Sequence, residues 1–132
     1  MKHVVTSGKR KTAIARATVT KGDGTVRINS HLLDHWGIHL ARLKIMEPLE
    51  LAGSKSKLVT IRVNVKGGGV MGQAYAIRTA IARGLVKYYN DDNLEEVFRS
   101  FDRSLIVNDA RRKETKKPLG RGARKKRQKS YR

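Results

Sequence analysis

The chain has 132 residues, and its 30 Lys and Arg against 11 Asp and Glu give a formal net charge of +19 at neutral pH. Such a charge indicates a polyanionic partner, either nucleic acid or an anionic membrane surface. The lack of cysteine excludes disulfides, thiolate zinc sites and cysteine nucleophiles, and no apolar run is long enough to span a bilayer.

The first third of the chain predicts strands. Val4 and Val5 begin an apolar stretch, and residues 13–20 alternate so that three alanines and Val19 share one face. Residues 21–24 are a turn signal, and residues 25–28 return as a strand, which predicts a hairpin with residues 13–20. The small alanine side chains should let a helix lie close to this face.

The middle of the chain predicts helix and then strand. Apolar residues between positions 31 and 53 recur three and four apart, as in an amphipathic helix. Gly37 and Pro48 should divide this region into short pieces, with Pro48 in the first turn of the last one. Residues 58–66 are the clearest strand, because four branched apolar residues alternate with polar ones.

Two more helices are predicted before the C-terminal segment. The first covers residues 73–89, and Asn90 to Asn93 end it. Asp92 and Glu95 have the spacing of a capping box at the start of the second helix. Residues 105–107 predict one further short strand.

The last 23 residues, from Ala110 to Arg132, differ in composition from the rest. They hold twelve Lys or Arg and one acid, Glu114. Such a segment cannot bury enough apolar surface to offset its conformational entropy, so we expect it to be disordered alone and ordered only against a polyanion. The sequence therefore predicts a globular part, residues 1–109, and an extended basic tail, residues 110–132.

The glycines after the predicted strand at 58–66 allow two interpretations. Gly67, Gly69 and Gly72 have the spacing of a dinucleotide fingerprint, and Asp91 and Asp92 follow at the distance of a ribose-binding acid. That acid should end a second parallel strand, however, whereas residues 87–92 are typical of a helix end and a turn. The favoured interpretation is a tight connection whose bare backbone approaches another backbone, such as an RNA phosphate at a helix N-terminus.

Two further patterns have simpler interpretations than the motifs that they resemble. Residues 8–12 resemble the end of a Walker loop but lack its first glycine, so we interpret them as a basic loop that contacts phosphate. His31, His35 and His39 could share one helical face, but their pattern is not that of the usual zinc sites. We therefore expect no metal and no cofactor. No arrangement of side chains argues for catalysis.

Four segments together resemble the universal small-subunit ribosomal protein nine family in its archaeal and eukaryotic form. They are residues 8–16, residues 63–69 continuing into 72–74, residues 76–83, and the tail from Asp109. The resemblance extends over essentially the whole chain. It implies an α+β fold with about four strands, helices packed on one face of the sheet, and an extended basic C-terminal tail.

The resemblance also implies partners and a place in the cell. The partners would be small-subunit ribosomal RNA, neighbouring proteins of the subunit head, and peptidyl-site transfer RNA at its anticodon stem-loop. The expected ribosomal RNA contacts are Lys9, Arg10, Lys11, Thr12, Arg16, Lys66, Gly68, Gly69, Gln73, Arg83, Arg111, Arg112, Lys113, Lys116, Lys117, Arg121, Arg124, Lys125, Lys126 and Arg127. The expected transfer RNA contacts are Lys129, Ser130, Tyr131 and Arg132. The N-terminal segment lacks the apolar stretch of a signal peptide, so a cytoplasmic location is expected.

Two functions from other classes remain as alternatives. A membrane-binding protein could use the basic tail as an electrostatic anchor, but lipidation signals and a basic amphipathic helix are missing. An enzyme could bind a nucleotide at Gly67 to Gly72, which a thermal shift with nucleotides would test.

Overall fold

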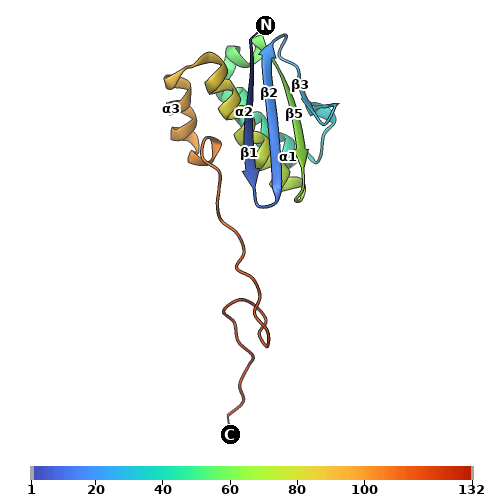
Figure 1. Cartoon of the computed structure of the whole chain (residues 1–132), viewed down its shortest axis with the longest axis vertical. Helices are drawn as coiled ribbons and strands as arrows, with labels where there is room; N and C mark the ends of the chain where they lie inside the picture. Colours follow the sequence, from blue (N-terminus) through green and yellow to red (C-terminus); the bar gives the residue numbers. More distant parts are fainter. Residues whose placement is uncertain (1, 132) are drawn as a thin grey trace.

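A mixed five-stranded sheet, one strand more than expected, is the base of the computed structural model, which describes residues 2–131 (Figure 1). Its strands lie in the order β1-β2-β5-β3-β4. β3 runs parallel to β5, and the other neighbours are antiparallel. The strands are β1 (His3–Arg10), β2 (Ala13–Lys21), β3 (Val26–Ile28), β4 (His31–Leu32) and β5 (Val59–Lys66).

The predicted hairpin between residues 13–20 and 25–28 is wrong. β2 pairs along eight residues with β5, and β3 joins the far side of β5. The turn at residues 21–24 does reverse the chain, but β5 offers a much longer ladder than the three residues of β3. Every second residue of β2 and β5 is buried, so their pairing buries one continuous apolar face.

Helix α2 (Val70–Tyr89) covers this buried face of the sheet. The alanines of β2 allow the close approach that the sequence predicted, because they and the facing alanines of α2 are fully buried. Gly8 of β1 marks the tightest point. A Cβ built there would lie 2.1 Å from the carbonyl oxygen of Ala76. The contact is therefore backbone to backbone, and any larger residue would push α2 off the sheet.

The predicted division of residues 31–53 is confirmed at Gly37, which lies between two helical pieces, and is wrong at Pro48. A 3-10 turn (Leu33–His35) is followed by one helix, α1 (His39–Ala52), with Pro48 inside it. Pro48 cannot donate a backbone hydrogen bond, but it is buried on the same side of the helix as Ala41, Ile45 and Ala52. The packing of this side outweighs the lost hydrogen bond.

Two details near the C-terminal end of the body differ from the sequence prediction. The side chain of Asp91, not Asp92, caps helix α3 (Asp92–Phe101) by accepting from the backbone of Asn93 and Leu94. Residues 105–107 are not a strand: Arg103–Leu105 form a 3-10 turn, and the buried Leu105 packs into the core. This segment closes the body beside β1, an outer strand of the sheet.

Beyond residue 112 the chain leaves the body. Figure 1 shows it running away from the sheet and folding into one loop on its way. Up to Tyr131 the only bridge is an isolated one between Gly120 and Lys126, and the side chains of this segment are mostly exposed. Among residues 2–131, no helix combines the length and the apolar character that a membrane crossing requires.

Candidate nucleic-acid interface

The face of the sheet that α2 leaves uncovered carries basic side chains. Register places Lys9 of β1, Ile14 of β2 and Lys66 of β5 side by side, and Arg16 lies opposite Asn64 in the next row. All five of these side chains are exposed. The sheet thus brings together three residues that the sequence predicted as RNA contacts.

Two arginines of the same face were missed. Arg62 of β5 and Arg27 of β3 are paired in register and are both exposed. The signal was present, because Arg62 alternates with the buried residues of β5. We call the outward side chains of Lys9, Arg16, Arg27, Arg62 and Lys66 the basic face. The five strands contain no Asp or Glu, so no carboxylate of the sheet opposes this charge.

The turn between β1 and β2 rests on the glycines that follow β5. Gly67 and Gly68 have φ angles of 79° and 67°, in the left-handed region that favours glycine. A Cβ at Gly67 would lie 2.5 Å from the carbonyl oxygen of Thr12, and one at Gly68 would lie 3.0 Å from the Cβ of Ala13. The chain itself therefore excludes side chains at both positions.

Gly69 differs from its two neighbours. Its φ of −95° is accessible to any residue, and no heavy atom lies within 4 Å of a Cβ built there. Of the two glycines expected to contact RNA, Gly68 is confined by the chain itself, whereas Gly69 is open. Gln73 donates from Nε2 to the carbonyl oxygen of Gly67 at 3.0 Å, so this predicted RNA contact also fixes the loop.

A hollow of about 310 Å³ lies where this loop meets the start of α2. Gly69 precedes the helix and gives it no side-chain cap, so the first backbone N–H groups of α2 have no capping acceptor. The positive end of the helix dipole and the nearby cations suit a phosphate oxygen. The residues lining the hollow are Arg10, Lys11, Thr12, Gly68, Gly69, Met71, Gly72 and Tyr75.

Residues 108–112, which we call the tail root, are bound to the end of β1 and to the β1–β2 turn. The backbone N–H of Lys9 donates to Oδ1 of Asn108 at 3.1 Å. Arg10 donates from Nη1 to the carbonyl oxygen of Arg111 at 2.6 Å, and Arg112 donates from Nη2 to that of Lys11 at 2.9 Å. The tail therefore starts at the same end of the sheet as the hollow.

A carboxylate reinforces the tail root. Asp109 accepts hydrogen bonds from the side chain and the backbone of Arg111 and lies 3.8 Å from Nε of Arg10. The hydrogen bond from the Arg111 side chain is the largest of the causes that hold the pKa of Asp109 well below its ordinary value. Asp109 is therefore ionised at neutral pH and forms an ion pair with Arg111.

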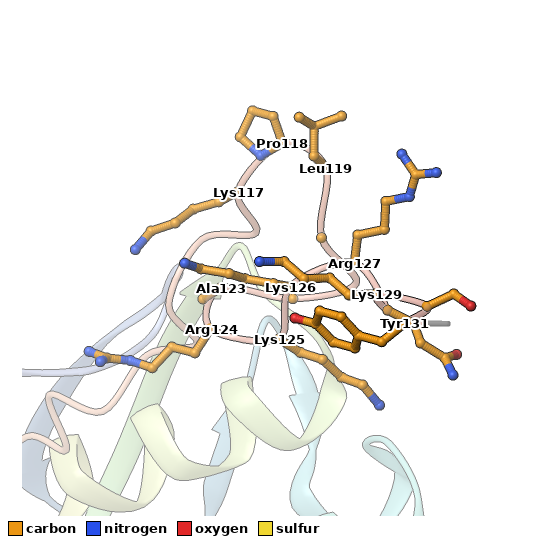
Figure 2. A pocket seen from close by; sticks show the side chains of 14 residues that line it. Lys117, Pro118, Leu119, Ala123, Arg124, Lys125, Lys126, Arg127, Lys129 and Tyr131 are labelled. Atoms are coloured by element: carbon orange, nitrogen blue, oxygen red, sulfur yellow. The ribbon is translucent and has the colours of Figure 1, made fainter.

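Further along, the tail folds into a loop that exposes its cations. Glu114 pairs with Nε of Arg124 at 3.0 Å and with Lys117 at 3.6 Å, and the backbone N–H of Arg121 donates to the carbonyl oxygen of Lys125. The space inside this loop, about 1040 Å³, is walled only by tail residues (Figure 2). It is open, and we do not interpret it as a ligand pocket. The predicted contacts Lys113, Lys116, Lys117, Arg121, Arg124, Lys125, Lys126 and Arg127 are all exposed.

The predicted transfer RNA contacts lie at the far end of the tail. Lys129, Ser130 and Tyr131 are exposed, and Tyr131 presents 84% of its surface to solvent. Arg132 lies outside the described residues. The structure thus separates these contacts from the basic face by the length of the tail.

The structure places one predicted RNA contact, Arg83, within the body. Its Nε donates to the carbonyl oxygen of Ile106 at 2.6 Å and its Nη1 to that of Ser7 at 2.9 Å. Arg83 therefore joins α2 to β1 and to the segment before the tail. Its sequence neighbourhood gave no sign of these two carbonyl partners.

The alternative sites found in the sequence do not assemble. Asp91 caps α3 and pairs with Lys55, and Asp92 begins α3, so neither ends a parallel strand as a ribose-binding acid would. His31 lies in β4, His35 in a 3-10 turn and His39 at the start of α1, so one helix does not carry all three. Within residues 2–131, no group of His, Asp and Glu has the arrangement of a metal site.

Comparison with known proteins gives one consistent result. The sequence pattern described as "Ribosomal protein S9/S16" matches residues 8–132. The chain belongs to this family. The ribosomal protein S9/S16 family consists of structural ribosomal proteins, which excludes the enzyme alternative.

Similar members of the S9/S16 family come from archaea. "Small ribosomal subunit protein uS9" of Thermoplasma volcanium is 57% identical over 132 residues, the full length of both chains. The protein of that name from Halobacterium salinarum is 56% identical and covers 96% of this chain and 97% of its own. That of Pyrobaculum aerophilum is 51% identical over 98% of this chain and 91% of its own. Because the matches include residues 110–132, the tail is part of the family pattern.

Proposed function

We propose that this chain is a structural component of the small ribosomal subunit and binds ribosomal RNA mainly through phosphates. The relatives named above carry this subunit in their names. The observation that carries the RNA proposal is the basic face, five exposed cations on strands without a carboxylate. Phosphates of an RNA strand complement such a surface, and Arg side chains can bind them in a bidentate manner.

The binding surface proposed here continues from the body into the tail. Lys9 and Lys66 lie at the end of the sheet where the hollow and the tail root are found. An RNA strand crossing the basic face can therefore pass the positive end of α2 and continue along the exposed cations of the tail. We expect Gly69, which is open in the free chain, to be the point of closest backbone approach to RNA.

We further propose that the end of the tail reaches peptidyl-site transfer RNA. From Arg112 to Tyr131 an extended chain spans roughly 60 Å, enough to leave the footprint of the body. Tyr131 can stack on a base or a ribose, and Ser130 and Lys129 can donate to phosphate oxygens. This role agrees with the family resemblance and with the exposure of all three side chains.

Two experiments test these proposals separately. Sedimentation through a high-salt gradient should leave the full chain on small subunits and release a variant that lacks residues 110–132. Deletion of residues 130–132 should leave assembly intact but weaken transfer RNA binding to purified subunits by about 1–3 kcal/mol, measured by filter binding. Normal transfer RNA affinity combined with defective assembly would reverse the roles assigned to body and tail end.

A further inference from the structure

Helix α3 and its two flanking residues carry nearly half of the acidic residues of the chain. Of the 11 Asp and Glu in the chain, five lie within residues 91–102, together with one Arg. Three of the five are held in ion pairs with Lys55, Arg78 and Arg99. Asp92 and Glu96 are exposed, and neither makes an ion pair within residues 2–131. Two carboxylates of α3 are therefore available to a partner.

The same helix exposes two large apolar side chains. Its buried side is formed by Leu94 and Phe98, which pack into the core. Val97 and Phe101, four residues apart and thus on one face, are 45% and 56% exposed. An exposed aromatic residue beside an aliphatic one is typical of the centre of a protein interface.

The exposed apolar surface extends toward α1. Arg78 donates to Asp102, which follows α3, and to Glu47 of α1, so the end of α3 lies beside the middle of α1. Leu43 lies one turn before Glu47 on the same side of α1 and is 46% exposed. Figure 1 shows α3 at the side of the body, clear of the basic face. A partner could therefore occupy α3 while RNA occupies the sheet.

We propose that α3 binds a Lys- and Arg-rich extended segment of a neighbouring protein in the small subunit. Glu96 lies about 100° around the helix from Val97, so the segment crosses α3 instead of following one side of it. Its cations pair with Asp92 and Glu96 on the outer side, and one of its apolar side chains packs on Val97 and Phe101. RNA is the wrong partner for α3, because its phosphates would be repelled by Asp92 and Glu96, which have no ionic partner within residues 2–131 to offset them. This inference requires only assembly into the subunit and is independent of the proposed RNA path.

Photocrosslinking within assembled subunits tests the proposal. p-Benzoylphenylalanine replaces Phe101 in the full chain, since both side chains are aromatic, and a matched variant carries it at Arg16 on the basic face. After irradiation of small subunits, the Phe101 variant should crosslink to a protein segment rich in Lys and Arg, identified by mass spectrometry. Crosslinks from position 101 to RNA, to an acidic segment or to a second copy of this chain would overturn the proposal, as would the absence of any crosslink.

The two variants distinguish this proposal from the proposed RNA binding. RNA crosslinks are expected only from position 16. If position 16 gives none while position 101 crosslinks to a basic protein segment, the RNA path is wrong and the α3 proposal stands.

Charge reversal provides a second test. Glu96→Lys should lower the crosslinking yield from position 101 roughly fivefold, because an attraction becomes a repulsion. The new Lys lies four residues after Asp92, a spacing that α-helices tolerate well, so the helix should remain folded. Glu50→Lys, at an exposed acid on α1, is the matched control and should leave the yield unchanged. Equal yields from both variants would show that charge on α3 does not select the partner.

Discussion

Substituting alanine for each of the three glycines between β5 and α2 should give three different results. Gly67→Ala places a side chain in the left-handed region, which costs about 1–2 kcal/mol. Its Cβ would also lie 2.5 Å from the Thr12 carbonyl oxygen, and the resulting shift of the β1–β2 turn adds about 1–3 kcal/mol. We therefore expect the free energy of unfolding to fall by about 2–5 kcal/mol.

The other two positions should cost less. Gly68→Ala has the same backbone cost, but its Cβ would lie 3.0 Å from the Ala13 side chain, so a small shift suffices and the loss should be about 1–3 kcal/mol. Gly69→Ala meets nothing within 4 Å at an ordinary φ. Alanine is a poorer helix N-cap than glycine, which destabilises the folded chain, but it also lowers the entropy of the unfolded chain. The two effects should cancel to within about 0.5 kcal/mol of the free energy of unfolding.

Urea unfolding of the full chain, followed by the fluorescence of its single tryptophan, Trp36, measures these stabilities. Filter binding to small-subunit ribosomal RNA is then compared with them. Gly69→Ala should weaken RNA binding without loss of stability, because its methyl group meets only the RNA. Equal destabilisation at all three positions, or none at Gly67, would refute the reasoning from backbone geometry.

Three further results are expected. In a plot of log RNA affinity against log salt concentration, the full chain should have a slope of about −4 to −5 if six cations neutralise phosphates. Deleting residues 110–132 should make this slope shallower. A truncated chain with the full slope would argue against phosphate contacts by the tail. Arg78→Met should lower the free energy of unfolding by about 2–4 kcal/mol, because it leaves the carboxylates of Glu47 and Asp102 without their buried partner. The control Arg99→Met, on the surface of α3, should change it by less than about 0.5 kcal/mol. Because the pKa of Asp109 is lowered in the folded chain, its contact with Arg111 should be intact above the free-chain value of about 3.9 and be lost as pH falls further. The Asp109 carboxyl signal in NMR measures this titration, and a midpoint at or above the free-chain value would contradict the reasoning.

Periodicity predicted the parts of the fold that bury one clean face. The alternation in β5 and the apolar stripe of α2 show which side of each element is buried. The alanines of β2 indicated that a helix packs closely against that strand. Pairing was not predictable in the same way, because the turn at residues 21–24 shows where the chain reverses and not which strand lies beside it. Pro48 likewise interrupts a hydrogen-bond pattern but says nothing of the packing that compensates for it.

The candidate site shows the same division. Arg16 and Lys66 could be identified because a strand displays alternate residues on one side. Lys9 was expected in a basic loop at residues 8–12, but β1 continues to Arg10 and places Lys9 on the same face. The carbonyl groups that Arg83 binds, those of Ser7 and Ile106, are distant from it in sequence. The sequence around Arg83 therefore does not reveal them, and RNA was the expected partner. The open position of Gly69 and the confinement of Gly67 depend on where Thr12 lies, which local sequence does not reveal.

The tail root has a consequence for the order of events during synthesis. Its hydrogen bonds join residues 99 and 101 positions apart, so β1 and the turn after it can bind the tail root only after nearly the whole body has been made. Contacts of such long range form late in folding. The direction in which the tail leaves the body is therefore fixed only once the body has folded. An incompletely folded chain would carry the same charges, but their position relative to the body would not be fixed. Correct folding is in this way a condition for delivering the tail to its place.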